Sequence, residues 1–190
     1  AAETDMSSSD IQKVVKLSDK IRKAGNELVG LMRKNYYHLM RTKRYRKLLK
    51  LYGSTEDKKK RKHFAGQLNE MQKQYDVTWD FCRKSMIFIG KKYNVDAVFA
   101  LTKAEDIWRG MEKCLYGNGN ILHFSKYGDL PCIRAKQMNR GIRIFVKDNK
   151  LQFKLGRTVF GIKINDRFQT DEVNAILDYL AEPEIMNNKA

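Results

Sequence analysis

Side chains that could bind a metal ion or act as general acids and bases are scattered along this sequence. A nuclease or phosphoryl-transfer site needs carboxylates that converge on a metal ion. The acidic pairs Glu105–Asp106 and Asp171–Glu172 instead follow predicted helix starts, where carboxylates stabilise the positive end of the helix dipole. The histidines are far apart and form no H-x-x-x-H pair: His38, His63 and His123. We therefore expect no catalytic activity, no metal and no cofactor.

The three cysteines, Cys82, Cys114 and Cys132, are too widely spaced for a C-x-x-C pair, and an odd number does not complete a set of disulfides. They indicate reduced thiols, packed as small core residues. The sequence contains no run of about 18 apolar residues, the length of a membrane span. Residues 1–9 are acidic and rich in serine, unlike a targeting segment. We expect a soluble cytoplasmic protein that does not bind membranes.

The charge pattern favours binding chemistry over catalysis. The 190 residues include 38 Lys and Arg against 22 Asp and Glu, which gives a net charge of +16. Residues 11–63 hold 18 basic and 4 acidic side chains, and residues 120–165 hold 10 basic and 2 acidic ones. The stretch between these two blocks is nearly neutral. Such blocks are typical of the two walls of a groove for a polyanion, although two solvated faces would give the same pattern.

In the first block, basic side chains alternate with tyrosines, so that charges could neutralise phosphates while rings stack on bases. At helical spacing Arg33, Tyr37, Arg41, Arg44 and Leu48 would share one face. The alternative is that Tyr36, Tyr37 and Tyr45 belong to the edge of the core. The candidate nucleic-acid-binding residues of this block are Arg33, Tyr37, Arg41, Lys43, Arg44, Arg46, Lys47 and Lys50.

The apolar spacing predicts a helical region over residues 10–117. Ser9 and Gln12 form a capping box for a long helix that continues to Gly53. A second helix follows Glu56–Asp57, and a third follows Thr78 as its N-cap. A fourth begins at the capping box of Thr102 and Glu105 and ends at Gly117.

The period changes to 2 after Gly119, which predicts a β-rich region over residues 120–182. Short strands are expected at 121–124 and 130–133, then a three-stranded antiparallel meander over 142–146, 151–155 and 160–164. Its other face carries basic residues. Thr170–Asp171 would cap a closing helix that stops near Pro183. The predicted class is α+β: a helical bundle, a small barrel-like antiparallel sheet and a C-terminal helix.

Three stretches taken in order are similar to a segment of TnpB-like proteins, the transposon-encoded RNA-guided nucleases related to type V CRISPR effectors. These stretches are residues 107–117, 124–130 and 133–143, which contain F-x-x-Y-G-x-L and I-x-x-K-x-x-N-x-x-G-I-R in near-matching form. The resemblance covers residues 11–165 and implies the helical recognition region running into the β-rich wedge domain. It assigns nucleic-acid contacts to Lys126, Tyr127, Arg134, Lys136, Asn139, Arg140 and Arg143.

The sequence departs from that family in two respects. The RuvC-like nuclease domain would follow the wedge, and this sequence contains none of its metal ligands or its C-x-x-C zinc element. The first wedge strand is also expected to be missing, because residues 1–9 show no apolar alternation. Cleavage is therefore not carried over from the family.

These observations lead to three hypotheses. The first is a non-catalytic protein that binds structured guide-type RNA or an RNA–DNA duplex by charge and shape. The second is an anti-CRISPR-type inhibitor that mimics the wedge and recognition region and occupies a type V effector or its guide RNA. The third is a fragment of a split nuclease, whose partner chain carries the catalytic site. Each would act in the cytoplasm of a bacterial or phage-infected cell.

Overall fold

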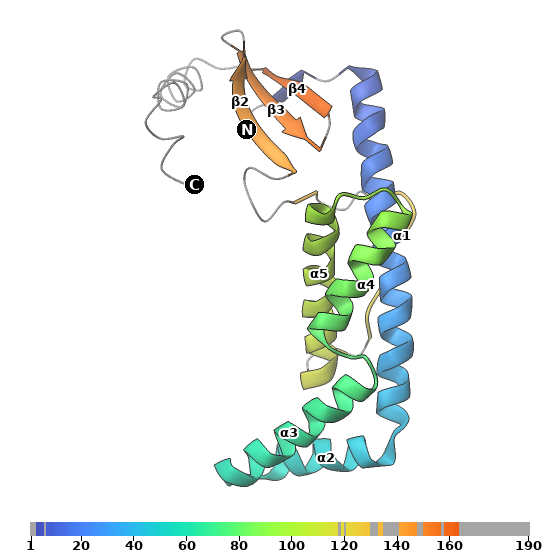
Figure 1. The fold of residues 1–190 in the computed structure, drawn as a ribbon, viewed down its shortest axis with the longest axis vertical. Helices are drawn as coiled ribbons and strands as arrows, with labels where there is room; N and C mark the ends of the chain where they lie inside the picture. The colour runs from blue at the N-terminus through green and yellow to red at the C-terminus, as the bar shows by residue number, and fades with distance from the viewer. Residues whose placement is uncertain are drawn as a thin grey trace. The chain divides into compact units, whose positions relative to one another are not determined.

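The structure is a computed structural model that describes residues 3–5, 7–117, 119, 121–129, 133–134, 141–147, 150–156 and 158–163 (Figure 1). The fold belongs to the α+β class, as predicted. The elements in chain order are β1 (Glu3–Asp5), α1 (Ser8–Arg41), α2 (Lys43–Ser54), α3 (Lys58–Gln74), α4 (Trp79–Lys92), α5 (Ala97–Tyr116), β2 (Ile142–Lys147), β3 (Lys150–Leu155) and β4 (Thr158–Lys163). The predicted closing helix lies outside the described residues, as does most of the strand predicted at 130–133.

The chain divides into two compact units. One contains residues 19–132, and the other contains residues 1–18 together with 133–190. The first unit comprises most of α1 and all of α2 to α5, while the second contains the sheet. In the described residues no helix combines the length and the apolarity needed to cross a bilayer.

The helix predicted from Ser9 to Gly53 is in fact two helices. Ser7, not Ser9, caps the start of α1, since its hydroxyl oxygen accepts a hydrogen bond of 3.2 Å from the Asp10 amide. Thr42 adopts an extended conformation with φ −70° and ψ 115°, which separates α1 from α2. Gly53 does not end the second helix, because α2 continues to Ser54.

The later helices begin with side-chain caps. Asp57 accepts a hydrogen bond of 2.8 Å from the Lys59 amide at the start of α3, and Thr78 accepts one of 3.2 Å from the Phe81 amide at the start of α4. Both of these predicted starts are confirmed. The first amide groups of a helix have no hydrogen-bond acceptor within the helix, and the side chain of the N-cap residue supplies one.

The start predicted for the fourth helix is wrong. Asp96 caps α5, six positions before Thr102, and its carboxylate accepts a hydrogen bond of 2.9 Å from the Val98 amide. The Thr102 hydroxyl instead donates to the Val98 carbonyl within the helix, so Glu105 and Asp106 are not first-turn residues. The predicted end at Gly117 is confirmed, and this glycine has φ 104°, a conformation that L side chains rarely adopt.

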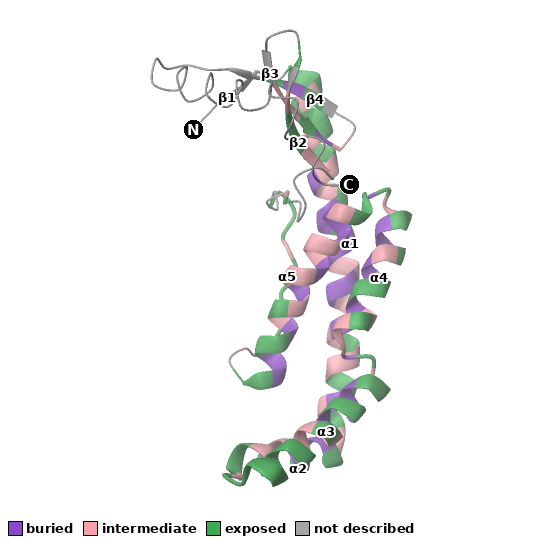
Figure 2. Cartoon of the chain, turned by 60° about the vertical axis from the view of Figure 1, so that its left-hand side comes forward, coloured by how far each residue is buried: buried purple, intermediate pink, exposed green. Residues whose placement is uncertain are grey.

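The core of the helical unit lies between α1, α4 and α5. Figure 2 shows their buried residues in purple between exposed stripes. The largest fully buried side chains include Leu28 and Met32 of α1, Met86 of α4 and Met111 of α5. The segment 121–124 is not a strand, contrary to the prediction. Its Leu122 is buried, and an added Cβ on Gly110 of α5 would meet the Leu122 side chain at 2.8 Å. Packing against α5 therefore takes the place of sheet pairing.

The sheet is antiparallel throughout, with the strand order β1-β4-β3-β2. The predicted meander is confirmed: Ile144 lies opposite Phe153, which lies opposite Phe160. The rings of Phe153 and Phe160 stack at 6.1 Å, and the Phe160 side chain is buried. The expectation that a first strand is missing is wrong, because Glu3–Asp5 pairs with β4. That pairing uses backbone groups, which need no apolar alternation.

Candidate nucleic-acid interface

The break at Thr42 redirects the chain so that α2 runs across the end of α1 (Figure 1). The hydroxyl groups of Thr42 and Tyr75 are hydrogen bonded at 3.0 Å, which joins the start of α2 to the end of α3. The short connection 55–57 then returns α3 alongside α2. The two helices thus form an antiparallel hairpin at one end of the helical unit.

The interior of this hairpin is apolar with one polar contact. Tyr45 and Leu48 of α2 and Leu68 and Met71 of α3 are buried. The Tyr45 hydroxyl accepts a hydrogen bond of 3.1 Å from the side-chain amide of Gln72, and burial raises the pKa of Tyr45. Because the apolar positions of α2 turn inward, its remaining positions turn toward solvent.

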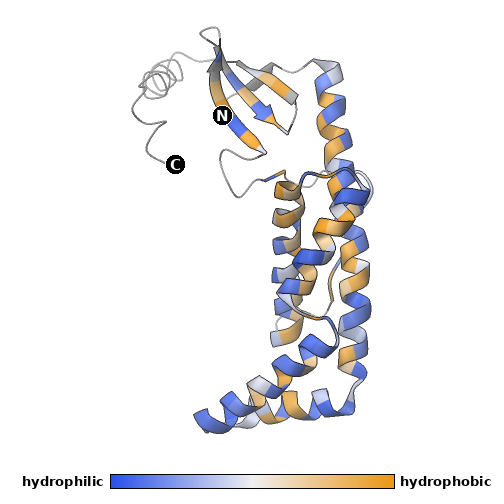
Figure 3. Cartoon of the chain, in the orientation of Figure 1, coloured by the Kyte–Doolittle hydropathy of each residue, from blue (hydrophilic) through white to orange (hydrophobic). Residues whose placement is uncertain are grey.

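Most of the exposed side chains of this hairpin are basic, although Leu51 of α2 is also 37% exposed. Residues 43–63 contain ten Lys and Arg side chains against Glu56 and Asp57. All ten are exposed, and Figure 3 shows the hydrophilic start of α3 in blue. We call this set the basic hairpin: Lys43, Arg44, Arg46, Lys47, Lys50, Lys58, Lys59, Lys60, Arg61 and Lys62.

The charges of the basic hairpin are not neutralised by nearby acids. Within the described part of the chain, the carboxylates that form ion pairs do so with other basic residues, for example Glu27 with Lys92 and Glu70 with Lys73. None of the ten side chains of the basic hairpin forms an ion pair with a described residue. Asp57 is engaged at the N-cap of α3. This end of the unit therefore presents uncompensated positive charge.

The single face predicted for Arg33, Tyr37, Arg41, Arg44 and Leu48 does not exist, because α1 ends at Arg41. The first three share a face of α1, whereas Arg44 is exposed on α2 and Leu48 is buried. The structure thus divides the predicted residues of the first block between the end of α1 and the basic hairpin.

The three tyrosines of this block have different surroundings. Tyr37 is 56% exposed, and the guanidinium carbon of Arg41 lies 4.3 Å from its ring centroid. Tyr45 is a core residue, and the Tyr36 hydroxyl donates a hydrogen bond of 3.1 Å to the Cys114 carbonyl. Burial raises the pKa of Tyr36. Only Tyr37 of the three therefore keeps an open ring face for stacking.

The predicted residues of the second block fall into both units. Lys126 and Tyr127 belong to the helical unit and are exposed, while Arg134 and Arg143 belong to the unit of the sheet. Lys136, Asn139 and Arg140 lie outside the described residues. The arrangement of the two blocks as facing walls stays a prediction.

The sheet has a basic side of its own. Arg143 lies directly opposite Lys154 in the register, and both side chains are exposed. Lys147 is exposed four positions further along that side of β2. The guanidinium of Arg143 lies 6.0 Å from the Phe145 ring on the same side. This set is called the basic sheet face below: Arg143, Lys147 and Lys154.

Sequence reasoning missed the lysines of α3 as site residues. The run of basic residues from Lys58 to Lys62 marked a helix start, and nothing in its own pattern placed it beside α2. The useful signal was the connection of three residues between α2 and α3, because a connection that short makes successive helices antiparallel neighbours.

Of the side chains considered for metal or acid–base chemistry, Cys132, Asp171 and Glu172 lie outside the described residues. The described residues contain no group of three or more His, Cys, Asp or Glu that could hold a metal ion. The Nε2 atom of His63 lies 3.0 Å from the Gln67 amide nitrogen. Cys82 and Cys114 are buried free thiols, as predicted.

Comparison of the chain with models of protein families, with curated proteins and with solved structures finds no match in any of the three.

Proposed function

We propose that this protein binds structured RNA or an RNA–DNA duplex through phosphate contacts made by the basic hairpin. The observation that carries the proposal is the exposure of ten basic side chains on two packed helices, without ion-pair partners among the described residues. When such groups bind phosphates, the counterions condensed on the nucleic acid are released, which favours association. Because both helices are fixed by a shared interior, the charges keep a defined spacing.

This surface suits a duplex with an RNA strand, recognised by its shape, better than a DNA site recognised by its base sequence. RNA duplexes are recognised by their shape and by contacts to phosphates and 2′-hydroxyl groups. Seven of the ten residues of the basic hairpin are lysines, which act as point charges toward phosphate and not as bidentate readers of base edges. The resemblance of residues 107–143 to TnpB-like proteins points to the same class of ligand, a guide-type RNA.

The basic sheet face offers a second surface for the same ligand class. Arg143 and Lys154 lie on neighbouring strands, which places two charges side by side on a rigid sheet. In the proposed function these residues contact the backbone of the same RNA or of its paired strand. Measuring this surface separately from the basic hairpin is possible, since the two sets share no residue.

An anionic membrane is the other polyanion that a basic amphipathic helix could bind. Helices of that type insert their apolar face into the headgroup region. In α2 that face is occupied, because Tyr45 and Leu48 are buried. Only Leu51 of the large apolar side chains of α2 is exposed, at 37%, so the charges of the basic hairpin are not accompanied by a continuous free apolar face, which favours nucleic acid.

The test is the salt dependence of binding to a structured guide-type RNA. The variant Lys43→Gln, Arg44→Gln, Lys47→Gln and Lys50→Gln removes four of the ten charges while leaving Tyr45 and Leu48 in place. By the duplex coefficient of about 0.9 per phosphate, the slope of log affinity against log salt should become shallower by up to about 3.6.

A matched control removes four charges that are already in ion pairs: Lys73→Gln, Arg83→Gln, Lys84→Gln and Lys92→Gln. This control should change the slope much less, although the net charge is the same. Absence of binding at low salt would overturn the proposal, and so would an equal loss of affinity in the two variants.

A further inference from the structure

One face of α1 carries a row of exposed aromatic rings, each paired with an arginine of that helix. One ring comes from α1 itself, and two come from the segment 121–129 that runs beside it. Tyr37, Phe124 and Tyr127 are 56%, 49% and 89% exposed. Their ring centroids lie 4.3 Å from Arg41, 5.0 Å from Arg33 and 5.5 Å from Arg22, respectively, measured to the guanidinium carbon. We call these three rings the aromatic row.

The spacing of the arginines explains why the rings are aligned. Arg22, Arg33 and Arg41 are separated by 11 and 8 positions, about 3.1 and 2.2 helical turns, so they lie within roughly 100° of one another around α1. Tyr37 lies between the last two, four positions from each. At 1.5 Å per residue, the row extends along about 28 Å of helix.

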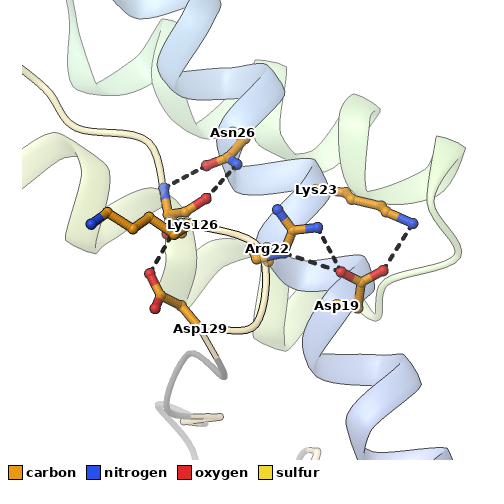
Figure 4. Close-up of polar contacts among 7 residues, drawn as sticks. Asp19, Arg22, Lys23, Asn26, Lys126 and Asp129 are labelled. Carbon is orange, nitrogen blue, oxygen red and sulfur yellow. Dashed lines mark hydrogen bonds and ion pairs between the residues drawn. The ribbon is translucent and has the colours of Figure 1, made fainter.

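The segment that carries Phe124 and Tyr127 is held firmly against α1. The side-chain amide of Asn26 donates to the Ser125 carbonyl and its oxygen accepts from the Ser125 amide, both at 2.9 Å (Figure 4). The Lys126 amide donates to the Asp129 carboxylate at 2.8 Å, which closes a turn around Tyr127. The backbone that carries Phe124 and Tyr127 is thus held in place, which lowers the entropy lost on binding.

A pocket of about 390 Å³ lies next to Tyr37. Met111, Ile121 and Leu122 give it an apolar lining, while Arg33 and Lys34 also line it. This volume falls within the range of pockets that enclose small ligands. A nucleobase is flat, apolar on its faces and polar at its edges, so it fits a lining of this composition.

The basic groups along the row differ in their availability. Arg22 is 8% exposed and its guanidinium lies 2.7 Å from the Asp19 carboxylate, so its charge is already paired. Lys34, Arg41 and Lys126 are exposed. These three can contact the phosphates of a strand whose bases lie on the rings.

We infer that the aromatic row binds unpaired nucleotides, with bases stacked on Tyr37, Phe124 and Tyr127 and one base in the adjoining pocket. This inference rests on the proposed function and adds to it a second ligand class, the single strand. Alternating stacking surfaces and positive charge are what single-strand-binding proteins use, on sites of about 4–16 nucleotides.

A duplex does not suit the aromatic row, because its base faces are covered by neighbouring base pairs. A single strand exposes those faces, and stacking on an aromatic ring is tolerant of sequence. The basic hairpin and the aromatic row therefore favour different parts of a structured RNA: paired regions for the first and unpaired regions for the second.

The experiment compares two strands of equal charge. One is a single-stranded RNA of roughly ten nucleotides, and the other is an abasic strand of the same length. The wild-type protein should bind the abasic strand at least tenfold more weakly, because each stacked base contributes about a factor of ten. A single-stranded DNA of the same sequence tests whether the 2′-hydroxyl contributes.

The variant Tyr37→Ala, Phe124→Ala and Tyr127→Ala should abolish the difference between the base-containing and the abasic strand. The milder variant Tyr37→Leu with Tyr127→Leu should reduce it and leaves the better-packed Phe124 in place. Phe88→Ala is the matched control, because Phe88 is a 75% exposed aromatic residue of α4, away from the row. It should bind both strands as the wild-type protein does.

The outcomes separate this inference from the proposed function. Equal binding of the two strands by the wild-type protein would overturn the aromatic row as a base-binding site. The four-glutamine variant of the basic hairpin should weaken both strands by the same factor and preserve the ratio between them. If that variant instead abolishes the ratio, the stacking site is wrongly placed. Absence of binding to any RNA would overturn the proposed function itself.

Discussion

The side-chain amide of Gln72 donates a hydrogen bond of 3.1 Å to the hydroxyl of Tyr45, and this contact joins α3 to α2 inside the basic hairpin. The two side chains are 7% and 1% exposed, respectively. A buried amide that loses its acceptor has no water to replace it. This polar contact, in an otherwise apolar interior, therefore helps to fix the spacing of the ten surface charges.

We expect Tyr45→Phe to lower the free energy of unfolding by about 1–3 kcal/mol, because it leaves the buried Gln72 amide without this acceptor. Adding Gln72→Leu should recover part of the loss. Urea denaturation followed by circular dichroism measures both changes. Tyr37→Phe, at an exposed ring, is the control and should change stability by less than about 0.5 kcal/mol. Equal losses at Tyr45 and Tyr37 would contradict the assignment.

Two helical glycines should respond to alanine with opposite signs. An added Cβ on Gly66 of α3 meets open space, so Gly66→Ala should stabilise the protein by about 0.5–1 kcal/mol through helix propensity. An added Cβ on Gly110 of α5 would lie 2.8 Å from the buried Leu122 side chain. Gly110→Ala should therefore lower the melting temperature, while Gly66→Ala raises it. If the melting temperature rose in both variants, the Leu122 side chain would be able to move away from the added methyl group without a loss of stability.

Local signals in the sequence were sufficient for much of the fold. Asp57 and Thr78 lie just before helical patterns, and a cap acts on amides only two or three positions away. The β2–β3 hairpin was predictable because alternation over six residues determines which side chains share a side. Each of these features depends on neighbours in the chain, so no distant contact is needed to find it.

Two of the errors come from contacts between distant residues, and a third comes from the choice between two local caps. Apolar spacing continues unbroken across Thr42, and the break there is accompanied by the contact with Tyr75 and by the burial of Tyr45. Glu3–Asp5 forms a strand because the edge of β4 supplies backbone partners. Thr102 resembles a cap in sequence, but Asp96 already begins the helix. Tertiary context overrides local preference in the first two cases, whereas in the third one local cap takes the place of another.

The candidate site was predictable in composition and not in geometry. The charge of residues 43–50 identified the basic surface directly. The pairing of Arg33 with Phe124 was not visible, because 91 positions separate the two residues and the F-x-x-Y-G-x-L pattern that contains Phe124 says nothing about its partner on α1. Only the packing of segment 121–129 along α1 brings them together.

We expect Asn26→Ala to release the segment that carries Phe124 and Tyr127, because it removes both hydrogen bonds to Ser125. Tryptic cleavage after Lys126 should become faster, since proteolysis follows local opening. Asn35→Ala is the control: it removes one long hydrogen bond of 3.4 Å elsewhere on α1 and should not change cleavage at this position. Unchanged cleavage in Asn26→Ala would show that contacts other than these two hydrogen bonds, such as that of the buried Leu122, hold the segment.

Cys82 gives the helical unit a predictable response to alkaline pH. Its side chain is fully buried, its thiol donates to the Ala104 carbonyl at 3.7 Å, and burial raises its pKa from 9.0 to about 12. The native state therefore keeps this proton at pH values where the unfolded chain has lost it. Stability from this group is complete below pH 9 and is lost as pH rises toward 12.

The free energy of unfolding should accordingly fall as pH increases above 9, by at most about 1.4 kcal/mol per pH unit from this one proton. The clearest window for measuring the effect of Cys82 lies between pH 9 and 10. Tyr45 keeps its proton in this window, because burial raises its pKa from the ordinary value of 10.0. Cys82→Ala removes the ionising group, so its stability should depend less steeply on pH there, even if the smaller side chain lowers stability at every pH. Urea denaturation of both proteins at several pH values measures the two slopes.

Cys114, whose pKa burial also raises, stays in both proteins and contributes equally to each. Parallel slopes would mean that the Cys82 thiolate is tolerated in the native core, which its lack of solvent exposure argues against.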